Sequence, residues 1–576
     1  MEGKQQVKSK QRVVDRGEVF TAEREVNAML DLVKQETERI DSRFLEPACG
    51  DGNFLSEILK RKLFVVEKKY KENAHDYEKY SILALMSIYG IDIMNDNVAD
   101  CRMRLFDIWK EKYNAVCKKN ATEKAEKAAE YVLNKNIICG NTLTMMRVDK
   151  KCNDTKKYIT FSEWSFVGDK VKRRDFRLDQ LLNGSNQYGR DTRTSSKFAP
   201  ETKLFIPKPI AEYFITDYLN LQKVEDIEEK REEEFEQFHT TKPEEFWNMK
   251  FDVIIGNPPY QLSTGGTTTQ ATPLYDKFVI QSKKLNPRFL IMITPSRWFS
   301  GGMGLNKYRK SMLSDKSIRK IVDYPNAKEC FPNVNISGGV SYFLWDRDNK
   351  GSCEFTNVSN GKEITLIRDL NEFETFIRYN EAISIVRKVL QFNERKLSEA
   401  GGCSSQTPFG FLSTFKGSET PISDDDCKIL SSKGWGYVNN AEVNKGRNLI
   451  NRYKPMISKL SCEHAGNPDK SGMYRVLSRM EILEPNEICN QSYLVITDFD
   501  NFEMAKNSYD YLRTKFVRFL ILQTLTSINI STNSFKFVPF QDFSKPWTDE
   551  ELYAKYNLAQ EEIDFIESII KPMNLR

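Results

Sequence analysis

Short apolar runs, most of them ending in a polar residue, recur along the first 345 residues of the chain. Seven such runs are predicted to be strands, over residues 43–46, 87–93, 136–141, 251–255, 288–294, 318–324 and 338–345. Between them apolar residues recur at helical spacing, for example over residues 54–62, 275–285 and 305–313. This alternation predicts an α/β fold with a doubly wound, mostly parallel sheet. Ligands of such sheets bind at the carboxyl ends of the strands, where the polar residues gather.

Residues 144–250 interrupt this alternation. They hold a basic and aromatic run from Lys156 to Arg177, a loop of small polar residues from Asn183 to Ser196, and a charged helix from Val224 to Phe238. A structureless loop of such length is uncommon, so we predict a subdomain inserted into a catalytic domain of residues 1–345.

The alternation ends after Trp345, and residues 346–576 are predicted to form a separate α+β domain. This region includes a long predicted helix from Phe502 to about Leu525. The start of a C-terminal helix is marked by Thr548 and Glu551, which have the spacing of a capping box.

The composition is that of a globular protein with two or three domains, with 576 residues, 40% of them hydrophobic and 29% charged. No apolar stretch reaches the ~18 residues that a membrane span needs, and the polar N-terminus lacks a signal-peptide core, so we expect a cytoplasmic protein. Eleven cysteines without Cys-x-x-Cys spacing indicate free thiols. Three scattered histidines predict no metal centre.

The net charge of +5 is small, so a nucleic-acid binder of this composition must concentrate its basic residues on one face. One candidate patch combines basic residues with aromatic ones: Lys170, Lys172, Arg173, Arg174 and Arg177 near Trp164, Phe166 and Phe176. It is either a phosphate-binding surface or a solvated charged hairpin. A second candidate patch consists of Lys445, Arg447, Arg452, Lys454 and Lys459.

The most informative motif is the turn Asn257-Pro258-Pro259-Tyr260, which follows the apolar strand of residues 251–255. Proline fixes its own φ and donates no N–H, so this turn presents carbonyl groups rigidly. The Asn257 side-chain oxygen and the Pro258 carbonyl are suited to accept the two hydrogens of a planar amino group. Tyr260 is suited to stack on the ring that carries this group, which is worth ~1–3 kcal/mol. The motif therefore favours methyl transfer to a planar amino group.

Polar residues at three other strand ends favour a nucleoside cofactor. The turn Gly50-Asp51-Gly52 allows close approach of a ligand, although it is also compatible with an ordinary tight turn. It lacks the third glycine of the dinucleotide fingerprint, which disfavours NAD. Asp92 suits the hydroxyls of a ribose, or a helix cap. Asn141 suits an adenine edge, or the completion of a turn. S-adenosylmethionine (SAM) is a nucleoside cofactor without a pyrophosphate.

These pieces together resemble a gamma-class DNA adenine methyltransferase of bacterial restriction–modification systems. The resemblance spans roughly residues 15–345, and the matching segments come in the family's order: residues 17–21, 45–52, 89–92, Asn141, 257–260, 274–278 and 331–332. Residues 481–573 are similar to the specificity end of the same enzymes. Residues 346–576 are therefore expected to recognise the DNA target.

The resemblance implies a role for each matching residue. SAM would be bound by Thr21, Glu46, Ala48, Gly50, Asp92, Ile93, Asn141 and Phe278. Asn257, Pro258 and Tyr260 would be catalytic, and an adenine flipped out of duplex DNA would lie on Tyr260 and be gripped by Phe331. Without the family pattern, Phe331 is read as a core aromatic at a turn. No metal is implied. The polar segment Ser263 to Thr269 is read as a loop that orders on ligand binding, or as an ordinary connector.

The implied partner is double-stranded DNA, and no membrane is involved. A separate cognate restriction endonuclease is a further partner that the resemblance allows, in a bacterial or phage-encoded system. The sequence departs from the family at three points. Ala22 follows Thr21 where the family often has proline, and Asn141 replaces a commoner aspartate. The long spacing from Glu46 to Asp92 implies an extra helical element around residues 63–85.

Three alternatives remain open. A bifunctional enzyme would also cleave DNA, but Glu67-Lys68-Lys69 is an isolated Glu-x-Lys, and we expect no nuclease domain in the short segment before Gly17. A protein-glutamine methyltransferase shares the Asn257 tetrapeptide but is compact. A DNA-binding module with a degenerate methylase core is disfavoured by the intact tetrapeptide.

Overall fold

The chain divides into two compact units. The computed structural model describes residues 12, 19–183, 209–223, 249–262, 272–334, 336, 338–359, 361–399, 401–462, 468–469, 472–525 and 528–573. Unit 1 comprises residues 1–295, 315–336 and 340–353, and unit 2 comprises residues 296–314, 337–339 and 354–576. The residues Gly17 and Glu18, most of the predicted loop of residues 183–196, the predicted helix of residues 224–238 and the polar segment of residues 263–269 lie outside the described residues.

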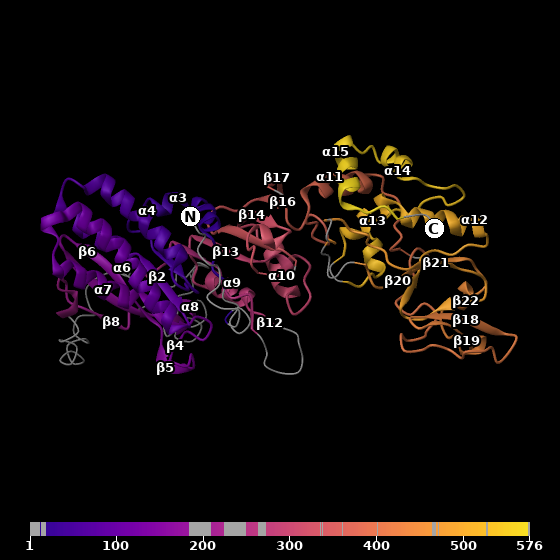
Figure 1. Ribbon diagram of the computed structural model, residues 1–576, viewed down its shortest axis with the longest axis horizontal. Helices are drawn as coiled ribbons and strands as arrows, with labels where there is room; N and C mark the ends of the chain where they lie inside the picture. Colours follow the sequence, from indigo (N-terminus) through magenta and orange to yellow (C-terminus); the bar gives the residue numbers. More distant parts are fainter. Residues whose placement is uncertain are drawn as a thin grey trace, which may run out of the picture. The chain divides into compact units, whose positions relative to one another are not determined.

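A large sheet forms the core of unit 1, and its strands run in the order β14-β15-β13-β10-β1-β2-β3-β4-β5 (Figure 1). Their bounds are β1 Phe44–Glu46, β2 Ile88–Asp92, β3 Ile137–Asn141, β4 Met146–Val148, β5 Asp154–Tyr158, β10 Val253–Gly256, β13 Phe289–Pro295, β14 Ile318–Tyr324 and β15 Val340–Asp346. The five central strands from β3 to β13 are parallel, and the strands outside them are antiparallel. The predicted mostly parallel sheet is confirmed.

The direction of strand addition reverses between β1 and β10. From β1 the chain adds β2 and β3 on one side, and it then returns to place β10 and β13 on the other side. In register, Phe44 of β1 pairs with Val253 of β10 and with Ile88 of β2. Crevices at such switch points, outside the carboxyl ends of the strands, are where open α/β sheets bind ligands.

Helices of unit 1 pack on this sheet and on each other, and the predicted extra helical element is present. Their bounds are α2 Glu23–Asp31, α3 Lys34–Thr37, α4 Asn53–Tyr70, α5 Ala74–Met86, α6 Asn95–Cys117, α7 Glu123–Asn136, α8 Leu178–Asn183 and α9 Tyr275–Lys284. The end of α4 and all of α5 fill the long spacing between Glu46 and Asp92. Asn73 caps α5 by accepting from the backbone N–H groups of His75 and Asp76.

The segment predicted as an insertion contributes to two sheets. β4 and β5 extend the main sheet beyond β3. A second sheet consists of β6 Thr160–Val167, β7 Lys170–Arg177, β8 Ala211–Glu212 and β9 Thr216–Asp217, and a short hairpin consists of β11 Gln261–Leu262 and β12 Thr272–Pro273. The division of the chain into functional domains stays a prediction.

Unit 2 combines α10 (Asn306–Ser314) with two small sheets and a group of helices. Its other elements are β16 Cys353–Ser359, β17 Lys362–Arg368, α11 Asn380–Gln391, β18 Asp426–Ser431, β19 Gly434–Asn439, β20 Lys454–Ser458, β21 Met480–Leu483, β22 Glu487–Cys489, β23 Tyr493–Val495, α12 Phe502–Arg513, α13 Lys515–Leu522, α14 Asp549–Lys555 and α15 Gln560–Ile569. Within this unit, β18, β19 and β22 form one sheet, and α13 packs against α14 and α15 (Figure 1).

The long helix predicted from Phe502 is in fact two helices. Thr514 has extended backbone angles, with φ −56° and ψ 149°, and its side chain caps α13 by accepting from the Val517 N–H. The apolar spacing continues across this break, and the helical periodicity therefore did not reveal it. The predicted capping box of Thr548 and Glu551 is present at the start of α14.

All eleven cysteines are free, as predicted. Within the described ranges, none of the helices is long and apolar enough to cross a membrane.

Among the described residues, each unit encloses one lysine that is completely removed from solvent. In unit 1, Lys62 on α4 donates to the Ile40 carbonyl at 3.1 Å, to the Ser87 hydroxyl at 2.6 Å and to the Ser42 carbonyl. These oxygens lie just before β1 and β2, so the ammonium joins the chain segments that enter the two strands. Burial disfavours the charged form, which lowers the pKa of Lys62 to about 7. In unit 2, Lys454 donates to the carbonyls of Ile450, Arg452 and Glu484, and burial lowers its pKa to about 8.

We predict that Lys62→Met changes the pH dependence of stability. Between pH ~7 and the ordinary lysine pKa, the unfolded chain binds a proton that the folded chain releases. The free energy of unfolding of the wild type should therefore rise with pH across this window, by up to about 1.4 kcal/mol per pH unit. The variant lacks this slope, so the stability lost by the substitution should grow from pH ~7 upward. Urea unfolding of both proteins at several pH values measures this difference in the free energy of unfolding.

Lys60→Met is the matched control, because Lys60 lies on the same helix and is half exposed. It should show the wild-type pH slope. Equal slopes for Lys62→Met and the wild type would contradict a buried lysine with a lowered pKa.

Candidate active site

A cavity of about 450 Å³ opens where the strand order of unit 1 reverses. All eight residues predicted to bind the cofactor line it: Thr21, Glu46, Ala48, Gly50, Asp92, Ile93, Asn141 and Phe278. They come from the carboxyl ends of β1, β2 and β3, from α9 and from the segment before α2. Asn257 and Pro259, at the end of β10, line the same cavity. Residues distant in sequence are thus brought together around one space.

The loop after β1 requires glycine at two positions. Gly50 and Gly52 both have positive φ, 51° and 84°. A Cβ atom on Gly50 would lie 2.8 Å from the Phe20 ring, and one on Gly52 would lie 2.7 Å from the Cys101 sulfur. The loop therefore passes close to its neighbours and leads directly into α4, which begins at Asn53.

Asp92 holds this loop in place. Its carboxylate accepts from the Gly50 N–H at 2.9 Å, from the Met94 N–H at 2.8 Å and from the Asn97 side-chain amide at 3.3 Å. The helix cap considered from the sequence is not formed, because the N-cap of α6 (Asn95–Cys117) is Met94 and no side chain caps it. Asp92 instead stabilises the turn before α6. This is a structural role. It does not exclude a contact with a ribose, because the two carboxylate oxygens together offer about four acceptor positions.

Asn141 completes a turn. Its side-chain oxygen accepts from the N–H groups of Leu143 and Thr144, at 3.1 and 3.4 Å. The side-chain amide nitrogen remains as a donor at the cavity wall. The neighbouring Thr142 hydroxyl donates to the Pro47 carbonyl at 2.5 Å, which joins the end of β3 to the loop after β1.

Glu46 and Thr21 bring polar atoms into the cavity wall that have no protein partner. The Glu46 Oε2 and Thr21 Oγ1 atoms are buried without a hydrogen bond. Burial raises the pKa of Glu46 well above its ordinary value, and nearby acidic groups including Asp51 and Asp92 add to this effect. Buried polar groups without partners are uncommon in folded proteins, so these atoms are suited to a polar ligand.

Asn257 is fixed with its oxygen available. The amide nitrogen donates to the Val19 carbonyl at 2.9 Å, while the buried Oδ1 atom has no hydrogen-bond partner in the part of the chain that the structure describes. The donation to Val19 determines which end of the amide is the acceptor. The strand β10 and the two prolines that follow Asn257 hold this acceptor at the cavity wall.

Tyr260 and Phe331 contact each other directly. Their ring centroids are 6.4 Å apart, with an angle of 79° between the ring planes, and both side chains are buried. Burial raises the pKa of Tyr260 well above its ordinary value, and its hydroxyl has no partner. The edge-to-face arrangement leaves no parallel slot between the two rings. Their predicted roles at opposite faces of a base therefore require one ring to turn.

Sequence reasoning did not identify several residues of the site, among them Phe20, Asn53, Asn97 and Lys277. Asn53 donates to the Thr21 carbonyl at 3.2 Å, and Asn97 supports Asp92. Lys277 brings a cation to the wall from α9. Phe20 and Lys277 lie inside motifs that were recognised, so a residue-by-residue inspection of these motifs would have found them. Asn53 and Asn97 act through folded contacts that the sequence does not display.

Comparison with known proteins relates the central segment to a known family. Residues 86–331 match the model of the Eco57I restriction-modification methylase family. This segment is therefore similar to the methylases of that family. An uncharacterized adenine-specific methylase of Mycoplasma pneumoniae is 32% identical over 158 residues, which are 25% of this chain and 37% of that protein.

A putative type II restriction enzyme and methyltransferase of Methanocaldococcus jannaschii is 26% identical over 343 residues, which are 49% of this chain and 28% of that protein. The chain therefore spans about a third of the length of these curated relatives. The type ISP restriction-modification enzyme LlaGI, solved as a nuclease-deletion mutant with a DNA substrate mimic, has a TM-score of 0.40 at 10% identity, over 89% of this chain and 45% of that one.

Four of the five cations of the first basic patch considered from the sequence are paired with carboxylates. Arg173 bonds to Asp175 at 2.6 Å, Arg174 to Glu163 at 3.0 Å, Arg177 to Asp179 at 2.7 Å, and Lys172 pairs with Glu212. Arg173 and Arg174 are also buried. The structure favours a charged hairpin over a phosphate-binding surface.

The second basic patch, in unit 2, is partly engaged in local contacts. Lys454 is buried among carbonyls, and Arg452 pairs with Asp498 and Asp500. Arg447 donates to the backbone carbonyls of Val443, Asn440 and Ala441. Lys445 and Lys459 donate to neutral groups, the Thr407 hydroxyl at 3.3 Å and the Gln406 side chain at 3.2 Å, so part of this patch keeps its positive charge.

We predict that Glu46→Gln stabilises the protein at alkaline pH. Because the folded-state pKa of Glu46 is raised, the folded chain retains a proton that the unfolded chain loses above its ordinary pKa. The wild-type free energy of unfolding therefore falls as pH rises through this window, by up to about 1.4 kcal/mol per pH unit. Glu46→Gln removes this loss, so the variant should be the more stable protein at pH ~8, by a margin that shrinks toward pH ~5.

Thermal or urea unfolding without added ligand measures the effect. The exposed Glu72 provides a control, and Glu72→Gln should follow the wild type. An unchanged pH slope in Glu46→Gln would show that the Glu46 carboxyl is not perturbed.

Proposed function

We propose that the protein is a SAM-dependent DNA adenine methyltransferase, the modification enzyme of a restriction–modification system. Support comes from the similarity to the Eco57I methylase family, from the relative named as an adenine-specific methylase, and from the cavity at the switch point of the sheet. The observation that carries the proposal is the buried, partner-free Asn257 Oδ1 atom at the cavity wall.

The cavity suits SAM in size and in chemistry. Its volume of about 450 Å³ is in the usual range for small-molecule sites. Asp92 would accept from the ribose hydroxyls, Asn141 would donate to the adenine edge, and Phe278 would pack on the cofactor. The Thr21 hydroxyl and Glu46 provide polar groups for the methionine part. SAM supplies a methyl group that is already activated by its sulfonium charge.

The Asn257 turn would supply the catalytic groups. An adenine amino nitrogen is a weak nucleophile because its lone pair is delocalised into the ring. Asn257 Oδ1 and the Pro258 carbonyl would each accept one amino hydrogen, which draws the nitrogen toward a tetrahedral shape. No strong base is needed, because positioning and fixed dipoles provide the stabilisation. The Asn257–Val19 hydrogen bond keeps the acceptor oriented before the base arrives.

The adenine must leave the duplex to reach this turn. Tyr260 would stack on the flipped base, and Phe331 would close the other face after one of the two rings has turned. Residues 346–576 would recognise the DNA target, and a separate restriction endonuclease would complete the system.

Transfer of tritium from labelled SAM to mixed DNA tests the proposal. We expect label in the adenine amino group of a subset of sites, and no label in any DNA would overturn it. Asn257→Ala should lower transfer by at least about 10²–10³-fold, because it removes one of two fixed acceptors, while SAM still binds. Full transfer by this variant would place the chemistry elsewhere.

The pair Tyr260→Phe and Tyr260→Ala separates the hydroxyl from the ring. The hydroxyl has no partner, so Tyr260→Phe should keep kcat/KM within about threefold of the wild type. Loss of the stacking ring in Tyr260→Ala should lower kcat/KM by about 10- to 100-fold. Steady-state kinetics on a methylatable duplex measures both. Equal effects of the two variants would contradict a stacking role.

DNA cleavage is a second candidate activity, because the Methanocaldococcus jannaschii relative is named as a restriction enzyme and methyltransferase. Adding magnesium to the same assay and analysing the DNA length tests it.

A further inference from the structure

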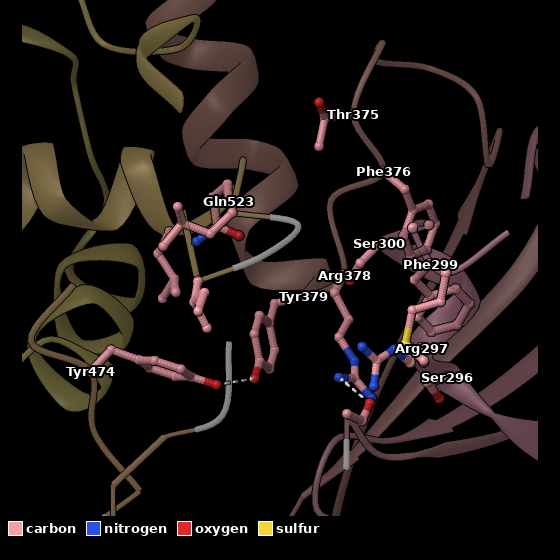
Figure 2. Close-up of a pocket in the computed structure, with 17 residues that line it drawn as sticks. Ser296, Arg297, Phe299, Ser300, Thr375, Phe376, Arg378, Tyr379, Tyr474 and Gln523 are labelled. Carbon is pink, nitrogen blue, oxygen red and sulfur yellow. Dashed lines mark hydrogen bonds between the residues drawn. The ribbon is translucent and has the colours of Figure 1, made fainter. Parts of the chain in front are cut away.

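Unit 2 contains a cavity of about 510 Å³ that the sequence did not predict. It lies among the short turn after Pro295, the segment before α11 and the end of α13. Figure 2 shows Arg297 and Arg378 on one side and Tyr379 and Tyr474 on the other. The lining residues include two arginines and, among the described residues, no aspartate or glutamate.

The two arginines approach each other through Gly338. The Arg378 guanidinium donates to the Gly338 carbonyl at 2.8 Å. A Cβ atom added to Gly338 would lie 3.8 Å from the Cα and Cβ atoms of Arg297. Two cations that share one cavity repel each other unless an anion lies between or beside them. The pair therefore favours a negatively charged ligand.

Arg297 differs from the arginines of the two predicted basic patches. It is exposed at the cavity wall, and no ion pair or hydrogen bond of its side chain occurs among the described residues. The arginines of the β6–β7 hairpin are paired with carboxylates, and Arg452 is paired as well. Arg297 thus retains a guanidinium whose paired donors match the geometry of a phosphate.

Four aromatic residues line the cavity together with aliphatic and polar ones. The Tyr379 and Tyr474 hydroxyls are 3.3 Å apart, within hydrogen-bond distance. Phe299 and Phe376 pack together at 4.7 Å between ring centroids, and the Arg378 guanidinium lies 5.7 Å from the Phe299 ring. A Cβ on Gly302 would meet no atom within 4 Å, so bare backbone faces open space at this edge. Cations beside flat rings are the combination that binds nucleic-acid strands.

We propose that this cavity binds one nucleotide of the DNA substrate, with its phosphate on Arg297 and Arg378 and its base against Tyr379. The inference rests on the proposed function, because it takes DNA as the ligand. It adds a binding site in unit 2 that is built from residues outside the cofactor cavity. The protein would contact the phosphate backbone of the DNA and the face of one base. Neither depends on the base sequence, so the contact contributes affinity for DNA of any sequence.

Arg297→Gln is the most direct test. Arg297 is exposed and has no partner among the described residues, so its replacement should leave the fold intact, whereas Arg378 also holds Gly338 and Phe299. The wild type and the variant are titrated with the same duplex at several salt concentrations. Loss of one phosphate contact should reduce the slope of log Kobs against log salt by about 0.7–0.9. Affinity should fall by a similar factor for cognate and unrelated duplexes.

Tyr379→Leu tests the aromatic wall. It should weaken DNA binding by about tenfold without changing the salt slope, because a ring contact releases no counterion. Arg387→Gln is the matched control. Arg387 lies on α11 of the same unit, but Glu372 already binds it through two hydrogen bonds of 2.6 and 2.8 Å. This variant should match the wild type in both affinity and slope.

SAM affinity, measured by calorimetry, should be unchanged in all three variants, which separates local effects from unfolding. If the wild type methylates DNA but Arg297→Gln keeps the wild-type salt slope, the cavity inference is wrong and the proposed function stands. If the wild type transfers no methyl group yet Arg297→Gln reduces the slope, the proposed function fails and the DNA contact stands. If Arg297→Gln weakens the binding of free ATP but leaves DNA binding unchanged, the DNA contact is wrong and the cavity is a site for a small nucleotide.

Discussion

The reversal of strand order between β1 and β10 is the constraint on which the candidate site depends. It leaves the carboxyl ends of two adjacent parallel strands open, with no connecting helix directly above them. Each element around this opening is fixed by a contact to another: Asp92 to Gly50, Thr142 to Pro47, and Asn257 to Val19. The cavity walls are thus held by hydrogen bonds between residues far apart in the sequence.

These hydrogen bonds engage backbone N–H groups and the Asn257 amide as donors, and they leave several side-chain oxygens of the cavity without a donor among the described residues. Asp92 and Asn141 already accept backbone N–H groups, while Asn257 donates its amide hydrogen and keeps its oxygen. The cavity therefore presents oxygen atoms without donors at Thr21, Glu46 and Asn257. Such atoms are costly in an apolar interior and favourable beside a ligand with hydroxyl or amino groups. The scaffold that orients the site thus also provides these acceptors, which lie in the same cavity as the Asn141 amide donor and the Lys277 cation.

The sequence predicted the central strands to within one or two residues, because apolar strands bounded by Gly, Pro and polar residues carry a strong local signal. The eight residues that it predicted to bind the cofactor do line one cavity, since the motifs mark strand ends that a parallel sheet must gather. Sequence analysis failed where a structure depends on an ion-pair partner far away in the sequence or on a single capping residue. Glu163 and Glu212 neutralise the basic hairpin, and a single Thr514 cap divides the predicted long helix.

Distant partners also explain why the number of basic residues in a segment did not predict how many of them keep an unpaired charge in the fold. A run of basic residues predicted two DNA surfaces, yet most of those groups are ion-paired, or buried like Lys454, so their fields are largely cancelled. Arg297 has no other basic residue near it in the sequence, so the search for basic patches did not find it. In the fold it faces a cavity with a second arginine and without a carboxylate among the described lining residues. A phosphate gains most from a cation that the protein has not already neutralised, so the isolated arginine is the better candidate for a DNA contact.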